Sequence, residues 1–97
     1  MQVSGNRVEV SGAVTLDTAK ATLVAGLSAL ATDCAGSNDV VFDLSKAGPL
    51  DSSALAVVFA WVRDAQAANK RIVLSNPPQE LLSLAAVYGV SDMLPLA

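Results

Sequence analysis

Two short β-branched runs separated by one helix-length segment constrain the fold of this chain more than any other feature. Residues 40–44 (VVFDL) and 71–75 (RIVLS) are rich in branched and aromatic side chains, which is typical of buried strands. Residues 45–50 (SKAGPL) are expected to form a loop, and a helix is expected from Asp51 or Ser52 to about Ala68. A strand, a helix and a strand joined by short loops form a βαβ unit, which predicts parallel strands with a right-handed crossover.

The segment before this unit is predicted to add a hairpin and one more helix. Residues 2–10 alternate weakly around Gly5 and Asn6, which indicates a hairpin whose second strand covers residues 7–11. Asp17 or Thr18 is positioned to cap a helix that runs to about Ala31. The βαβ unit therefore belongs to a larger sheet.

The segment after the unit is predicted to form a third helix. Pro77 and Pro78 can start it, and Gly89 can end it. One face of this helix is expected to consist of Leu81, Leu84, Ala85 and Tyr88. Together these elements predict a single α/β domain over residues 1–97, with a small mixed β-sheet and helices mainly on one side.

Composition excludes several classes of function. The formal charge is −3 and the six basic residues are scattered, so a nucleic-acid surface is not expected. The longest apolar run, residues 54–62, is about half of what a bilayer crossing needs. No secretory signal is recognisable at the N-terminus, and the single Cys34 predicts neither a disulfide nor a metal site. We therefore expect a soluble cytoplasmic protein without cofactors.

Apolar residues make up 53% of this small chain, more than a single core of this size can hide. We therefore expect an apolar contact patch for another protein. Catalysis is not expected, because the chain has no histidine and no glycine-rich phosphate loop. Nothing in the sequence places Lys46 or Lys70 beside a serine that it could activate.

The segment GPLDSSALAVV, residues 48–58, combines an acid and two serines with a long apolar run. Asp51 or Ser52 can cap the following helix, but one cap explains only one of these polar residues. On a helical wheel Leu55, Val58, Phe59 and Val62 share a face that should meet the sheet. Val57 and Trp61 fall beside that face, next to Ala54 and Ala68, so Trp61 is either a core-edge residue or a contact anchor.

The stretch VVFDLSKAGPLDSSALAVVFAWVRDA resembles the central strand, loop and helix of the STAS domain family. The family pattern of an acid, a serine, a serine or glycine, a glycine and a leucine is matched by residues 51–55 (DSSAL), with Ala54 where many members have glycine. In anti-sigma factor antagonists of this family a kinase-like anti-sigma factor phosphorylates the first serine. The resemblance thus implies that Ser52 is a candidate phosphorylation site.

The C-terminal segment NPPQELLSLAAVYGVSDMLPL is similar to the ending of the MlaB-type branch of the same family. That similarity implies a non-catalytic subunit bound to the cytoplasmic ATPase of an ABC-type phospholipid transporter, peripheral to the inner membrane. The alternative is an anti-sigma factor antagonist regulated by phosphorylation of Ser52. The residues predicted to contact the partner are Leu50, Asp51, Ser52, Ser53, Ala54, Val57 and Trp61.

Overall fold

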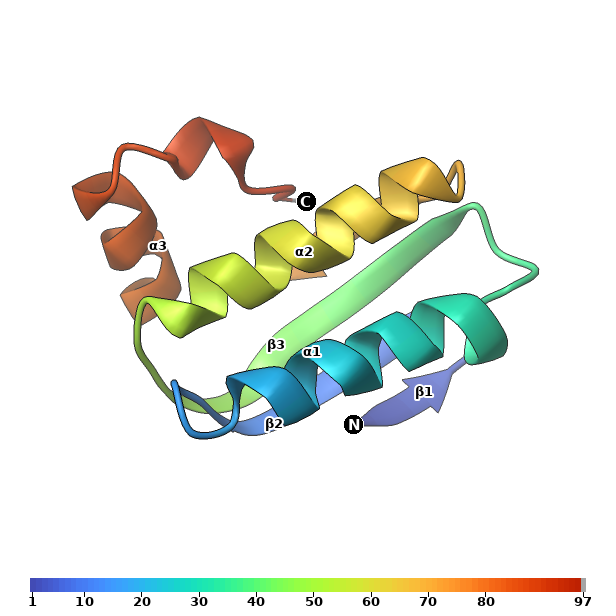
Figure 1. Ribbon diagram of the computed structural model, residues 1–97, viewed down its shortest axis with the longest axis horizontal. Coiled ribbons are helices and arrows are strands. Elements are labelled where there is room, and N and C mark those ends of the chain that lie inside the picture. The colour runs from blue at the N-terminus through green and yellow to red at the C-terminus, as the bar shows by residue number, and fades with distance from the viewer. Residues whose placement is uncertain (97) are drawn as a thin grey trace.

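The computed structural model describes residues 1–96, in which four strands form one mixed sheet (Figure 1). In sheet order these strands are β1 (Gln2–Ser4), β2 (Arg7–Val14), β3 (Asp39–Leu50) and β4 (Arg71–Ser75). β1 and β2 are antiparallel and are joined by a tight turn in which Gly5 has a φ of 60°. β2, β3 and β4 are parallel to one another. The predicted hairpin and the parallel βαβ strands are therefore confirmed.

The helices lie mainly on one side of this sheet, as the sequence predicts. They are α1 (Ala19–Ser28), its π-helical continuation η1 (Ala29–Asp33), α2 (Ser53–Ala67), α3 (Gln79–Val87) and the short 3-10 helix η2 (Ser91–Met93). α1 and α2 lie side by side over one face of the sheet, and α3 lies beside the start of α2 (Figure 1). After η2 the chain returns to the sheet, where the Leu74 N–H donates to the carbonyl oxygen of Pro95 at 2.7 Å.

The predicted loop at residues 45–50 is wrong, because β3 continues as a strand to Leu50. β4 ends at the pair Asp43–Ser75, but β2 runs on to Val14, beyond its predicted end at residue 11, and keeps pairing with β3. This pairing contains two register shifts, of which the second, between the pairs Gly12–Ala47 and Val14–Leu50, accommodates Gly48 and the following proline. β3 therefore ends directly before residue 51, which lies at the start of α2.

The third helix begins and ends where the sequence predicts, but one residue of its predicted inner face lies outside. α3 follows the proline pair, and Gly89, with a φ of 70°, comes directly after its C-cap residue Tyr88. Leu81 and Ala85 are buried, whereas 59% of Tyr88 is exposed. Tyr88 lies at the point where the helix ends, so the helical face no longer directs its side chain inward.

The core between the sheet and the helices centres on an aromatic pair. The ring centroids of Phe42 on β3 and Trp61 on α2 lie 4.5 Å apart. The indole N–H of Trp61 also donates to the carbonyl oxygen of Leu23 on α1, at 3.1 Å. Gly26 on α1 leaves room for this indole, because a Cβ there would lie 2.1 Å from the indole nitrogen. Trp61 therefore ties α1, α2 and the sheet together.

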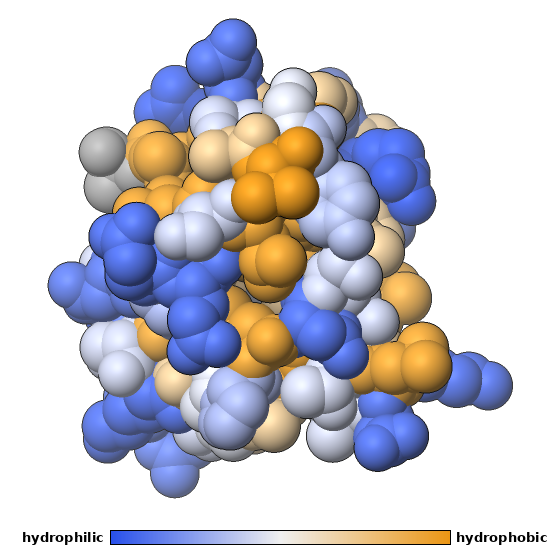
Figure 2. Space-filling model, turned by 90° about the vertical axis from the view of Figure 1, so that its left-hand side faces the viewer, coloured by the Kyte–Doolittle hydropathy of each residue, from blue (hydrophilic) through white to orange (hydrophobic). Residues whose placement is uncertain are grey.

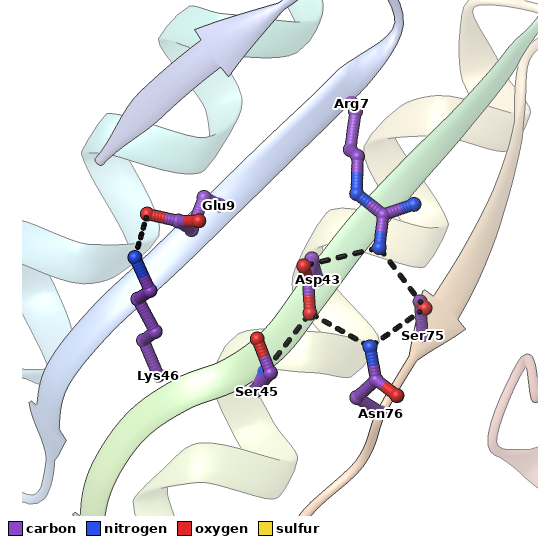
Figure 3. Close-up of polar contacts among 7 residues, drawn as sticks. All are labelled: Arg7, Glu9, Asp43, Ser45, Lys46, Ser75 and Asn76. Carbon is purple, nitrogen blue, oxygen red and sulfur yellow. Dashed lines mark hydrogen bonds and ion pairs between the residues drawn. The ribbon is translucent and has the colours of Figure 1, made fainter.

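The opposite face of the sheet is polar and is held by ion pairs between neighbouring strands. Figure 3 shows Arg7 on β2 reaching Asp43 on β3, with Nη2 and Oδ2 3.0 Å apart. Asp43 also accepts hydrogen bonds from the Ser45 N–H and from the Asn76 side chain. These donors, together with the Arg7 guanidinium, lower the pKa of the Asp43 carboxyl well below its usual range. The network fastens β2, β3 and the end of β4 to one another.

Candidate functional site

The segment from Asp51 to Ser53 begins α2, and Asp51 is the residue that stabilises this end of the helix. Its Oδ1 atom accepts the backbone N–H of Ser53 at 2.8 Å. Its Oδ2 atom accepts the backbone N–H of Leu16, from the turn between β2 and α1, at 2.9 Å. Both bonds favour the ionised carboxylate and lower the pKa of Asp51, the Leu16 bond contributing most. Asp51 thus caps the helix and fastens the neighbouring turn to it.

The side chain of Ser52 does not cap α2. It occupies the N-cap position of α2 in backbone terms, yet its side chain makes no capping hydrogen bond. The residue is exposed at the end of the molecule, and the following Ser53 is half-buried. Because Asp51 already accepts the Ser53 N–H, the Ser52 hydroxyl is available to a group outside the domain.

Three of the predicted contact residues lie inside the protein, and this part of the prediction is wrong. Ala54, Val57 and Trp61 are exposed by only 3%, 3% and 1% respectively. The apolar pattern of α2 is so broad that it did not reveal which side faces inward. α1 packs beside α2 and covers the side that holds Val57 and Trp61. These three residues pack beneath the exposed side of α2 and are not part of its surface.

The outward side of α2 carries a different set of side chains, which we call the outward stripe. With helical spacing it consists of Ser52, Ala56, Phe59 and Arg63, of which Phe59 is half-buried and the others are exposed. Phe59 was predicted to meet the sheet, whereas it borders the surface. The members of the stripe lie opposite Trp61 on a helical wheel, so the sequence indicates the stripe only once Trp61 is known to face inward.

A groove beside the outward stripe runs between the start of α2 and the end of α3. We call it the α2–α3 groove, and it is lined by Ser52, Leu55, Phe59, Tyr88 and Val90. A neighbouring hollow is lined by Leu50 at the end of β3 and by Glu80, Val87 and other residues of α3. Figure 2 looks onto this end of the molecule, where apolar side chains form a central band bordered by hydrophilic ones. Val87 and Tyr88 are exposed by 80% and 59%.

The chemistry available at this end is that of a contact surface. Its groups are a hydroxyl, apolar side chains and a carboxylate held by backbone amides. Within residues 1–96 no three carboxylate, cysteine or histidine side chains lie close enough together to hold a metal ion. None of the helices in the same residues has both the length and the apolar character needed to cross a bilayer.

Comparison with known proteins gives matches over nearly the whole chain. The family model described as MlaB, STAS domain, matches residues 1–95. The intermembrane phospholipid transport system binding protein MlaB of Haemophilus influenzae is 36% identical over 55 residues, which are 57% of this chain and 52% of that protein. The chain therefore matches about half the length of this curated relative.

Two solved structures of the anti-sigma factor antagonist SpoIIAA share the fold. The unphosphorylated form matches 100% of this chain and 84% of its own with a TM-score of 0.70 and 16% identity. The phosphorylated form, described as a Bacillus cell fate determinant, matches 100% of this chain and 87% of its own with a TM-score of 0.66 and 16% identity. At this identity the likeness concerns the arrangement of strands and helices alone.

Proposed function

This chain belongs to the STAS domain family of the MlaB type, and from that premise we propose that it is a non-catalytic subunit of an ABC-type phospholipid transport complex. In this proposal the domain binds the cytoplasmic ATPase of the complex and stabilises or activates it. The complex moves phospholipid between two membranes and maintains the lipid asymmetry of the outer one. The domain is then cytoplasmic and peripheral to the inner membrane through its partner.

The observation that carries this proposal is the Ser52 hydroxyl at the exposed start of α2, which makes no capping hydrogen bond. A serine used only to begin the helix would bond to a backbone N–H of the first turn, and here Asp51 does so instead. Ser52 also lines the α2–α3 groove, and the small Ala56 lies one helical turn after it. A hydroxyl beside apolar surface suits a protein interface, because it adds direction to a contact that burial drives.

In the proposed complex the outward stripe lies against the ATPase. Ser52 contributes one interfacial hydrogen bond, worth about 1 kcal/mol net. Ala56 lets the partner backbone approach α2 closely, and Phe59 supplies apolar area. Leu50 and Ser53 border this contact, while Asp51 holds the helix start and the adjacent turn in place. Since no bond is made or broken in the domain, its effect on the ATPase is one of mutual stabilisation.

Affinity capture of the tagged protein from its own cells tests the identity of the partner. We expect an ABC ATPase and its permease to be recovered and identified by mass spectrometry. Recovery of a kinase-like anti-sigma factor instead, together with a Ser52 phosphopeptide, would replace the transport proposal with the phosphorylation-switch alternative. The captured partner is then purified for direct binding measurements.

Variants of α2 test the surface. Ser52→Ala should weaken ATPase binding about fivefold, and Ala56→Arg should weaken it by more than tenfold because the larger side chain blocks close approach. The matched control is Ala67→Arg, since Ala67 is also exposed on α2 but lies about four turns away from the helix start. Thermal denaturation should show that all three variants are as stable as the wild type, within about 0.5 kcal/mol. A large loss of stability in Ser52→Ala would mean that the serine serves the helix.

A further inference from the structure

Most of the positive charges of this protein are already engaged by groups within the domain. Three of its six basic residues form ion pairs between neighbouring strands of the sheet, and these are Arg7, Lys46 and Arg71. A fourth, Lys70, donates to three backbone carbonyl oxygens that follow η1. The remaining two are Lys20 and Arg63, and neither forms an ion pair within residues 1–96.

These two remaining bases line one depression, which lies between α1 and α2 and which we call the α1–α2 depression. Figure 1 shows the two helices side by side over the sheet. Lys20 comes from the first turn of α1 and Arg63 from the third turn of α2, and both residues are exposed. Each of the two helices that form the depression therefore contributes one cation that is available to a partner.

The other side chains of the depression are mostly small. Ala19 on α1 and Ala56 and Ala60 on α2 line it, together with the more buried Leu23 and Val57. The distance at which two helices pack depends on the size of the side chains between them, so alanines allow another helix to approach closely. The depression therefore offers a shallow apolar seat for a helix, with a cation from each helix beside it.

Within residues 1–96 no carboxylate lines the α1–α2 depression. Asp64 follows Arg63 in sequence but lines a separate hollow together with Lys70. Asp17 precedes α1 and is not a lining residue, and Asp51 directs both of its oxygen atoms to backbone N–H groups. The lining residues of the depression thus carry positive charge only, although the whole chain has a formal charge of −3.

We propose that the α1–α2 depression receives an amphipathic helix of a partner protein, in which aspartate or glutamate residues border a face of alanine and leucine. The apolar face packs on the alanines of α2 and on Leu23, and the bordering carboxylates pair with Lys20 and Arg63. This inference rests on the proposed function in placing the partner against α2, and it adds the chemistry by which the partner is recognised there.

The same features disfavour two other occupants. Recognition of an anionic lipid surface uses clusters of about four to eight basic residues, whereas this depression has two. Helices that lie in a membrane interface also present large apolar side chains outward, and here the outward apolar residues are alanines. A second copy of this chain would bring the same two cations opposite each other, so two such depressions would repel.

The test uses the complete ¹⁵N-labelled domain and two synthetic helical peptides of about 18 residues, or five turns. Both peptides have the same face of alanine and leucine, which is bordered by glutamate in one and by lysine in the other. The glutamate peptide should shift the amide signals of Lys20, Leu23 and Ala60 saturably and bind at least about fivefold more tightly than the lysine peptide.

The comparison of the two peptides is strict, because the net charge of the domain works against the expected result. A general charge effect on a domain of charge −3 would favour the lysine peptide. Equal affinities, or a preference for the lysine peptide, would therefore overturn the proposal. Amide shifts confined to the α2–α3 groove or to the polar face of the sheet would overturn it as well.

Charge variants identify the two cations. Arg63→Gln and Lys20→Gln should each weaken the glutamate peptide about threefold. The matched control is Arg71→Gln, which makes the same charge change at an exposed residue of β4 and should leave the affinity unchanged. Arg63→Glu should bring the two peptides to about equal affinity. Variants of Lys20 and Arg63 that bind like the control refute the pairing.

A packing variant tests the seat between the helices. Ala60→Leu fills part of the depression and should weaken the glutamate peptide about fivefold. The matched control is Ala67→Leu, which adds the same group about two turns further along α2, at a residue that does not line the depression. Equal binding by both variants contradicts the assignment. The charge variants change exposed side chains, so they decide the proposal even if Ala60→Leu does not fold.

Two further measurements examine the other occupants. Co-sedimentation of the domain with phosphatidylglycerol vesicles but not with phosphatidylcholine vesicles, lost in Arg63→Gln, would overturn the proposal in favour of a membrane surface. Shifts of the same amide signals when the domain alone is concentrated would overturn it in favour of a second copy. We expect neither result.

The outcome is separable from that of the proposed function. If the purified ATPase does not bind the wild-type domain, the transport proposal fails, and the peptide titration still decides the chemistry of the α1–α2 depression. If the ATPase binds the wild type, Arg63→Gln and Lys20→Gln equally well, and the two peptides behave alike, the inference about the depression fails while the transport proposal stands.

Discussion

Gly26 is the position where a single added methyl group should disturb the core most. It lies in α1, where replacement of glycine by alanine normally stabilises a helix by about 1 kcal/mol. Here the new Cβ would lie 2.1 Å from the indole nitrogen of Trp61. The indole belongs to a buried ring packed on Phe42, so it cannot yield without moving α1 or α2.

The expected magnitude follows from three contributions. Overpacking of a well-filled core costs about 1–3 kcal/mol. Displacing the indole also breaks its hydrogen bond to the Leu23 carbonyl oxygen, which leaves the buried indole N–H unpaired at a cost of about 1–3 kcal/mol. The gain in helix propensity offsets about 1 kcal/mol. These contributions leave a net loss of about 1–5 kcal/mol, so Gly26→Ala should lower the free energy of unfolding by about 3 kcal/mol, or the midpoint temperature by roughly 12–24 °C for a domain of this size.

Urea denaturation followed by far-UV circular dichroism measures this effect. The matched control is Gly36→Ala, because no atom lies within 4 Å of a Cβ at that position. The control should be within about 0.5 kcal/mol of the wild type. In the Trp61→Phe background the smaller ring leaves room for the methyl group, so Gly26→Ala should cost much less there. The reasoning is refuted if Gly26→Ala is as stable as the wild type or more stable, since the added methyl group would then meet no steric resistance from the indole.

Two further predictions concern the acids that the fold holds in their ionised form. Asp43→Asn should lower the free energy of unfolding by about 2 kcal/mol, measured by urea denaturation, because it removes charge-assisted bonds that join three strands; a change below about 0.5 kcal/mol would contradict this. The folded-state pKa values of Asp43 and Asp51 are lowered, so their contribution to stability is present above the unfolded pKa of ~3.9 and is lost as the pH falls below it. Stability should therefore decline between about pH 5 and pH 2, and Asp43→Asn should show a shallower decline.

The parts of this fold that could be predicted from sequence are those bounded by residues with strong local backbone preferences. Gly5 and Asn6 mark the hairpin, and the proline pair and Gly89 mark the two ends of α3, because each of these residues restricts or permits a particular backbone conformation. β3 was predicted too short for the opposite reason. Glycine and proline at positions 48 and 49 look like a loop, but the pairing strand β2 extends alongside them. The extension of β3 depends on its pairing with β2, which the local sequence of β3 does not indicate.

The phase of α2 could not be predicted for a related reason. Apolar residues occur on nearly every side of this helix, so periodicity alone does not distinguish the side that meets the sheet from the side that meets solvent. The choice depends on α1, whose Gly26 makes space for Trp61 and whose Leu23 carbonyl oxygen accepts a hydrogen bond from the indole N–H. A glycine in one helix and a tryptophan in another thus determine jointly which residues of α2 reach the surface.

This arrangement separates stability from recognition at the start of α2. The Asp51 carboxylate satisfies the Ser53 N–H and holds the Leu16 turn, while Trp61 and its neighbours fix the helix from the inside. The helix therefore does not need the Ser52 side chain to form, and a change in what Ser52 contacts need not alter the fold. That independence is what a docking residue requires, because a partner can then form or break its hydrogen bond to Ser52 without changing the stability of the folded domain. It holds equally for a partner that bonds to the hydroxyl and for one that modifies it.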